Sequence, residues 1–159
     1  MCVTQAEPGA TGRIEIGADP ARVYRLVSDP GVLAELSEEY TGFRWLGGNA
    51  GARVGARFRG VNRRGLRRWS TVSTITDADE GRRFAFEVRS MSVIPVSRWQ
   101  YDFAATGEGC VVTESTWDRR PGWFRFPSAL ATGGWRRAAD NRVNIATTLR
   151  RLKERAERD

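Results

Sequence analysis

Alternating apolar and polar residues dominate the chain up to about residue 118. In residues 13–17 (RIEIG), Ile14 and Ile16 share one side, which is typical of a half-buried strand. Similar patterns predict further strands at residues 43–46, 56–62, 66–76, 82–89, 96–105 and 110–117. From residue 56 onward only short turns separate them, so the pattern predicts an antiparallel meander rather than a parallel sheet.

Two short helices are predicted between the first and second strands. Asp19 suits the N-cap of the first helix and Pro20 its first turn, and the sequence SDPG at 28–31 ends it. The second helix carries Val32, Leu33 and Leu36.

Residues 135–157 contain neither proline nor glycine, and they predict one long amphipathic helix of about 23 residues. Its inward stripe is expected to comprise Trp135, Ala138, Arg142, Ile145, Leu149, Leu152 and Ala156. Arg142 within this stripe could pair with an anionic or phenolate oxygen of a ligand, form a salt bridge with Glu114, or extend its charge to solvent.

These elements predict an α+β domain at residues 13–159, preceded by a disordered or extended tail at residues 1–12. One long helix must cover the apolar face of a twisted sheet, and the two short helices would close one end. A curved sheet cannot close perfectly around a single helix, so a cavity is expected between them.

Large aromatic side chains occupy the positions that face this helix on neighbouring strands: Phe58, Trp69, Phe84, Phe86, Trp99, Tyr101 and Phe103. They could fill a core, or they could line an apolar pocket in which Thr71, Ser73 and Glu114 are polar anchors. We expect the pocket, with Trp69 facing the cavity.

The formal net charge is +7, and 26 basic side chains include a single lysine, Lys153. Such a balance can indicate nucleic-acid binding. The arginines are spread along the chain, however, and even in RGVNRRGLRRWS at 59–70 strand parity puts Arg59 and Arg68 opposite Trp69. Most of these arginines are therefore expected on an outer surface, with no specific nucleic-acid partner.

Histidine is absent, which excludes catalytic pairs and metal sites that need an imidazole. Cys2 and Cys110 are expected as free thiols, and neither a metal nor a cofactor is expected. Any catalysis must use carboxylates, tyrosine, arginine or bound water. The candidates are Glu114, whose pKa burial would raise, and Tyr101, which could donate to a carbonyl.

No run of about 18 apolar residues and no secretory signal occurs, so we expect a cytoplasmic protein without integral membrane association, as a monomer or homodimer. The segment WFRFPSAL at 123–130 could be a lid over the pocket or a protein-contact surface; we favour the lid.

The order of strand, two helices, meander and long helix resembles the START-like, or SRPBCC, superfamily with its helix-grip fold. It is more closely similar to the polyketide cyclase/dehydrase and lipid-transport branch. The stretches that carry the resemblance begin at IEIGADPARVYRLVSDPGVLAEL and end at NIATTLRRLKERAE, and they span residues 13–157. The resemblance implies a hydrophobic ligand cavity under the long helix, and it carries over no catalytic residue.

The sequence thus favours binding of a small hydrophobic ligand, whether aromatic, polyketide-like, lipid or isoprenoid. The alternative is an aromatase-type polyketide cyclase/dehydrase that uses a buried carboxylate or tyrosine. A module that binds anions or nucleic acid is the third hypothesis.

Overall fold

The computed structural model describes residues 6–48 and 51–158, and its main element is one curved antiparallel sheet of seven strands. The strands lie in the order β1-β7-β6-β5-β4-β3-β2. Their bounds are β1 Ala10–Ile16, β2 Tyr40–Trp45, β3 Arg57–Arg64, β4 Arg67–Asp79, β5 Arg83–Ser90, β6 Ile94–Ala105 and β7 Cys110–Asp118. The predicted meander and the α+β helix-grip architecture are confirmed.

Four helices accompany the sheet: α1 Pro20–Val27, α2 Pro30–Leu36, α3 Gly122–Thr132 and α4 Arg137–Glu157. Aspartate caps both short helices at their N-termini. The Asp19 carboxylate accepts from the Ala21 amide at 2.8 Å, and the Asp29 carboxylate accepts from the Gly31 amide at 2.8 Å. Each cap satisfies a backbone N–H group that has no partner within its helix.

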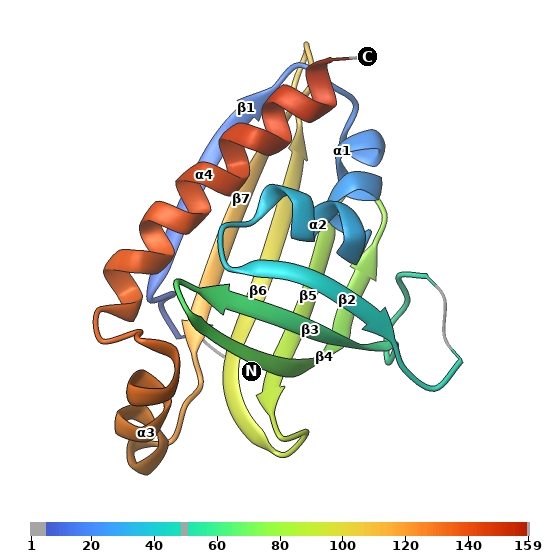
Figure 1. The fold of residues 1–159 in the computed structure, drawn as a ribbon. Coiled ribbons are helices and arrows are strands. Elements are labelled where there is room, and N and C mark those ends of the chain that lie inside the picture. The colour runs from blue at the N-terminus through green and yellow to red at the C-terminus, as the bar shows by residue number, and fades with distance from the viewer. Residues whose placement is uncertain (1–5, 49–50, 159) are drawn as a thin grey trace.

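The long helix α4 runs along the concave side of the sheet and packs mainly against β1 (Figure 1). Gly12 makes this close approach possible. A Cβ atom at Gly12 would lie only 2.7 Å from Cγ2 of Ile145. The missing side chain therefore lets the helix lie directly on the first strand.

The β3–β4 hairpin has the expected parity. Arg57, Arg59 and Arg68 are exposed, whereas Phe58 is buried on the other side. The strands are longer than expected, however, because pairing continues to Arg64 opposite Arg67. The turn is therefore at Gly65 and Leu66 rather than at residues 63–65, which lie between the two predicted strands.

Two other expectations need correction. No helix was predicted in the connection before the long helix, but residues Gly122–Thr132 form α3, next to the start of α4 (Figure 1). The first strand begins at Ala10, so residues 10–12 belong to the sheet rather than to a tail. Residues 1–5 of the expected tail, which include Cys2, and Asp159 lie outside the described residues. No helix in the described parts of the chain is long and apolar enough to cross a membrane.

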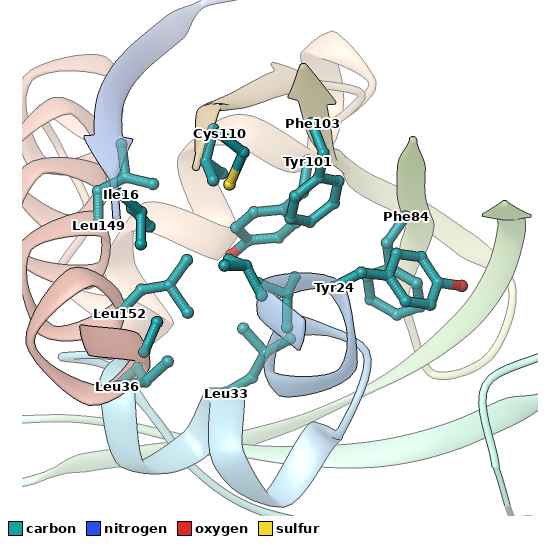
Figure 2. Close-up of a cluster of buried hydrophobic side chains, with 14 of the residues drawn as sticks. Ile16, Tyr24, Leu33, Leu36, Phe84, Tyr101, Phe103, Cys110, Leu149 and Leu152 are labelled. Carbon is teal, nitrogen blue, oxygen red and sulfur yellow. The ribbon is translucent and has the colours of Figure 1, made fainter. Parts of the chain in front are cut away.

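A dense core closes one end of the space between helix and sheet. Tyr24 of α1 packs edge-on against Phe84 and Phe103, with ring centroids 6.2 Å and 5.8 Å apart (Figure 2). Leu149 and Leu152 of α4 and Leu33 of α2 complete the same cluster. We call this the closed end.

Candidate functional site

A cavity of about 190 Å³ lies between the concave face of the sheet and the first half of α4. Its lining extends from buried residues such as Leu33 to the exposed Glu38 and Asp118, so it opens to solvent away from the closed end. We call this opening the mouth. The volume exceeds the roughly 150 Å³ of an apolar cavity that takes up benzene, and it is below the roughly 300 Å³ at which drug-sized sites begin. The cavity therefore suits a ligand with one aromatic ring or two fused rings.

Most of the predicted site residues line this cavity, and strand parity identified them correctly as inward-facing. They are Phe58, Trp69, Thr71, Ser73, Phe86, Trp99, Tyr101 and Glu114. Phe58 and Phe86 pack edge-on with ring centroids 5.8 Å apart, and Trp99 donates its indole N–H to Ser97 Oγ at 3.2 Å. Aromatic surface thus forms the wall on the β3–β6 side.

Phe84 and Phe103 point to the same side of the sheet but do not line the cavity. The reason is Tyr24, which covers both rings from α1. Phe84 is completely buried and Phe103 is 7% exposed. These two predicted site residues therefore belong to the core of the closed end.

Arg142 also lies elsewhere than expected. It is exposed on α4 and does not line the cavity. The helix is rotated so that its polar residues face the cavity instead: Arg137, Asn141, Asn144 and Thr148. Sequence reasoning missed these because polar side chains on an amphipathic helix were assigned to solvent. Their spacing of three and four residues, continuing the line toward Leu152, was the available signal.

Glu114 is the most unusual group in the cavity wall. It is 2% exposed, and its Oε1 accepts a hydrogen bond of 2.7 Å from the phenol of Tyr101. Its Oε2 is buried and has no hydrogen-bond partner among the described residues. Buried polar atoms are nearly always paired, so an unpaired carboxyl oxygen beside a cavity marks a place where a ligand atom could bind.

The electrostatic consequence is a carboxylic acid rather than a carboxylate at neutral pH. Burial raises the pKa of Glu114 to about 8, and the hydrogen bond from Tyr101 offsets only part of this shift. Burial also raises the pKa of Tyr101 well above its ordinary value of 10, and the nearby Glu114 adds to this effect. Because Oε1 accepts from Tyr101, the proton of the neutral acid resides on Oε2.

Tyr40 supplies a second unpaired polar atom. It lines the cavity from β2, and its hydroxyl is buried without a partner among the described residues. Its ring lies against Gly60, where a Cβ atom would be 2.7 Å from Cε2 of Tyr40. Gly60 therefore allows this ring to enter the space above β3. Sequence reasoning did not single out Tyr40, which lay before the predicted second strand.

Ion pairs hold the first turn of α4 to the rim of the mouth. Arg137 contacts Glu39 at 2.9 Å, and Arg64 of the β3–β4 hairpin contacts Asp140 at 2.8 Å and Glu39 at 3.4 Å. Arg120 joins the end of β7 to α3 by contacting Asp118 and Ser128, each at 2.8 Å. Helix α3 therefore borders the cavity through Ser128 and Thr132.

The described residues contain no group of three histidine, cysteine, aspartate or glutamate side chains arranged to hold a metal ion. This wall offers one buried acid, the hydroxyl groups of Tyr101 and Tyr40, and apolar aromatic surface.

Comparison with known proteins gives one family. Residues 8–157 match the family model described as polyketide cyclase/dehydrase and lipid transport. No curated protein shows a significant sequence match.

Solved structures share the fold. A polyketide-cyclase-like protein from Corynebacterium glutamicum is 27% identical, with a TM-score of 0.59 over 96% of this chain and 94% of that one. A protein from Chromobacterium violaceum is 19% identical, with a TM-score of 0.67 over 94% of this chain and 98% of that one. The di-domain ARO/CYC protein of the steffimycin biosynthetic pathway is 15% identical, with a TM-score of 0.68 over 93% of this chain and 50% of that one.

Proposed function

Because the chain belongs to the polyketide cyclase/dehydrase and lipid transport family, we propose that it binds a small, mainly apolar ligand and holds one ligand oxygen at Glu114. The observation that carries this proposal is the buried Oε2 of Glu114, which has no partner among the described residues although Glu114 lines the cavity. A buried polar atom without a partner costs roughly 1–3 kcal/mol. A ligand that supplies the missing partner recovers that cost on binding.

The rest of the wall provides affinity without directional contacts. Phe58, Phe86 and Trp99 bury apolar ligand surface, which is worth roughly 25 cal/mol per Å². A flat aromatic ligand suits these rings because edge and face contacts between aromatic groups are favourable.

The protonation state of Glu114 determines which kind of ligand oxygen can bind there. With a pKa of about 8, the side chain is a hydrogen-bond donor at Oε2 near neutral pH. A carbonyl oxygen accepts such a bond. A ligand carboxylate would place a second negative charge in this buried wall whenever Glu114 ionises, which is unfavourable. We therefore favour an aromatic ketone or quinone over a fatty acid.

Binding of two nearly isosteric probes tests the assignment. 2-Acetylnaphthalene carries a carbonyl acceptor, and 2-isopropenylnaphthalene replaces that oxygen by CH₂. We expect the wild-type protein to bind the ketone about fivefold more tightly at pH 7, as for one hydrogen bond worth roughly 1 kcal/mol. Fluorescence titration of the probes measures both dissociation constants.

Two variants test whether the hydrogen-bond donor at position 114, rather than its ability to ionise, causes the preference for the ketone. Glu114→Leu combined with Tyr101→Phe removes both polar groups, so it leaves neither unpaired and should bind both probes equally. Glu114→Gln keeps a neutral donor and should keep the preference for the ketone. Equal binding of both probes by the wild-type protein, or an unchanged preference in the double variant, would rule out Glu114 as the oxygen site.

The buried acid Glu114 also supports a second candidate function, that of a cyclase/dehydrase. In the dehydration of a β-hydroxy ketone, Glu114 would give its proton to the departing hydroxyl group. The C–O bond breaks, water leaves, and the resulting carboxylate takes the α-proton as the C=C bond forms. A pKa near the working pH suits both halves of this transfer.

Glu114→Gln distinguishes the two functions, because glutamine can donate a hydrogen bond but cannot transfer a proton. A binding protein would release an unaltered ligand from both forms. An enzyme would convert its β-hydroxy ketone only in the wild-type form. Native mass spectrometry of protein purified from its own host would identify the bound molecule.

A further inference from the structure

Exposed apolar side chains gather at one end of the molecule. Among the described residues nine large apolar side chains are exposed, and all except Val54 and Val143 belong to segments that border the mouth. These are Leu66, Met91, Val93, Trp123, Phe126, Leu130 and Trp135. We call this set the mouth surface.

The topology explains why residues so far apart in sequence meet there. In an antiparallel meander, alternate turns lie at the same end of the sheet. The β3–β4 turn carries Leu66, the β5–β6 turn carries Met91 and Val93, and β7 ends beside α3 at this same end. The cavity is lined near these turns by Asn62 and Val96.

Helix α3 presents the largest part of the mouth surface. Trp123, Phe126 and Leu130 lie at spacings of three and four residues on one helix face, and they are 68%, 66% and 58% exposed. Ser128, on the opposite face, is buried, and so is Ala129. Phe126 also contacts Trp135 ring to ring at 5.5 Å, so the surface continues to the start of α4.

The charge around the mouth surface is positive. Seven exposed arginines lie in or next to the same segments: Arg63, Arg67, Arg68, Arg89, Arg119, Arg125 and Arg136. Within the described chain none of them forms a salt bridge, whereas nearby Asp118, Glu39 and Asp140 are paired with other arginines. The turns of the closed end carry the exposed acidic residues Asp19, Asp79, Glu80 and Glu108, and the exposed acids near the mouth are Glu7, Glu38 and Asp118. Glu38 and Asp118 are each paired with an arginine.

We propose that the mouth surface docks on an anionic lipid membrane, with α3 lying in the interface and the cavity opening toward the lipid. Tryptophan and phenylalanine favour the boundary between headgroups and acyl chains, and each arginine near an anionic surface contributes about 1 kcal/mol. A ligand could then pass between bilayer and cavity without crossing water.

The combination of exposed apolar side chains and surrounding arginines favours a lipid surface over other partners. Two copies of this chain would bring their arginine-rich ends together, and like charges repel. Nucleic acid would use the arginines and the aromatic rings, but it offers nothing to Leu66, Met91, Val93 and Leu130. The inference stands independently of which ligand fills the cavity.

Flotation of the full chain with vesicles tests this inference. The probes are vesicles of phosphatidylcholine alone and of phosphatidylcholine with phosphatidylglycerol. We expect association with the anionic vesicles that weakens as salt is added. Arg67→Gln with Arg125→Gln should lower the partition coefficient roughly fivefold per arginine. The matched control, Arg82→Gln with Arg158→Gln, removes the same charge at the closed end and should change it little.

A second pair of variants tests the apolar contribution. Trp123→Ser with Phe126→Ser should abolish flotation, whereas Val54→Ser, which alters a side chain that is 66% exposed at the other end, should not. Circular dichroism confirms that each variant is folded. Equal flotation with neutral vesicles, no flotation, or equal loss in the Arg82 and Arg158 control would overturn the inference. So would a dimer, or an RNA complex, that accounts for the mouth surface in place of lipid.

Discussion

Tyr101 and Glu114 are direct neighbours across the β6–β7 ladder, and the same two side chains form the buried hydrogen bond in the cavity wall. On the other side of Glu114, the register places Gly12 of β1. Ile145 of α4 lies against Gly12. The acid is therefore positioned by three paired strands and covered by the long helix, with no loop involved.

The buried acid predicts that stability depends on pH. Glu114 has an ordinary pKa of 4.5 and a folded-state pKa of about 8. Between these values the folded protein holds more protons than the unfolded chain, so the stabilising contribution of the neutral acid is complete below pH 4.5. It is lost as pH rises toward about 8, by up to about 1.4 kcal/mol per pH unit.

Urea denaturation of the wild type and Glu114→Gln between pH 5 and pH 9 measures this dependence. The difference in unfolding free energy between the two proteins should shift in favour of the glutamine variant as pH rises. Parallel curves would show that Glu114 is already ionised in the folded protein.

Neighbouring phenylalanines on β5 should have separable roles. Phe84 is fully buried against Tyr24, whereas Phe86 lines the cavity. We expect Phe84→Leu to lower the unfolding free energy by about 1 kcal/mol without changing the affinity for 2-acetylnaphthalene. Phe86→Leu should weaken probe binding with a smaller effect on stability. Weaker probe binding by Phe84→Leu would place that ring in the site after all.

The contact between helix and first strand predicts a steric effect. Gly12→Ala would place a Cβ atom 2.7 Å from Ile145, so α4 must move away from β1. We expect a loss of about 1–3 kcal/mol in unfolding free energy, which urea denaturation measures. Gly42→Ala is the matched control, because nothing lies within 4 Å of a Cβ atom there. A similar loss in both variants would indicate a general effect of alanine in these strands.

The ion pairs at the rim predict local mobility. Glu39→Gln removes the partner shared by Arg64 and Arg137, so the start of α4 should loosen. We expect faster hydrogen exchange at residues 133–144 and a loss of about 1 kcal/mol in stability. Glu38→Gln affects a more exposed pair with Arg151 and should leave exchange at these residues unchanged. Equal exchange in both variants would mean that packing alone holds this helix turn.

Strand parity predicted much of the site, because a side chain in a strand has only two directions. Trp69, Tyr101 and Glu114 were identified in this way and line the cavity. Phe84 and Phe103 had the correct direction, but only the tertiary position of Tyr24 shows that α1 covers them. Parity identifies the face of a sheet and says nothing about what packs on it.

The helices were harder to predict for a physical reason. The face of a helix is inferred from hydrophobicity, and Asn141, Asn144 and Thr148 are polar residues on an inward face. Arg142 was consequently placed inward although it is exposed. No helix was predicted for the segment that forms α3, which contains Pro127, a residue that disfavours a helix interior. Predictions from sequence start from apolar residues inside and polar residues outside. Polar residues that face a cavity and aromatic residues on the surface both depart from this rule.

The contact between the two ends of the chain also determines when the cavity can form. Gly17 of the β1–α1 connection donates to Glu157, 140 residues later, and Lys153 donates to the carbonyl of Glu15. Such distant contacts slow folding, because a long loop must close before they form. During synthesis, β1 can pair only after β7 has emerged, and the aromatic wall stays uncovered until α4 follows. We therefore expect the unfinished chain to be most prone to aggregation just before its last helix leaves the ribosome.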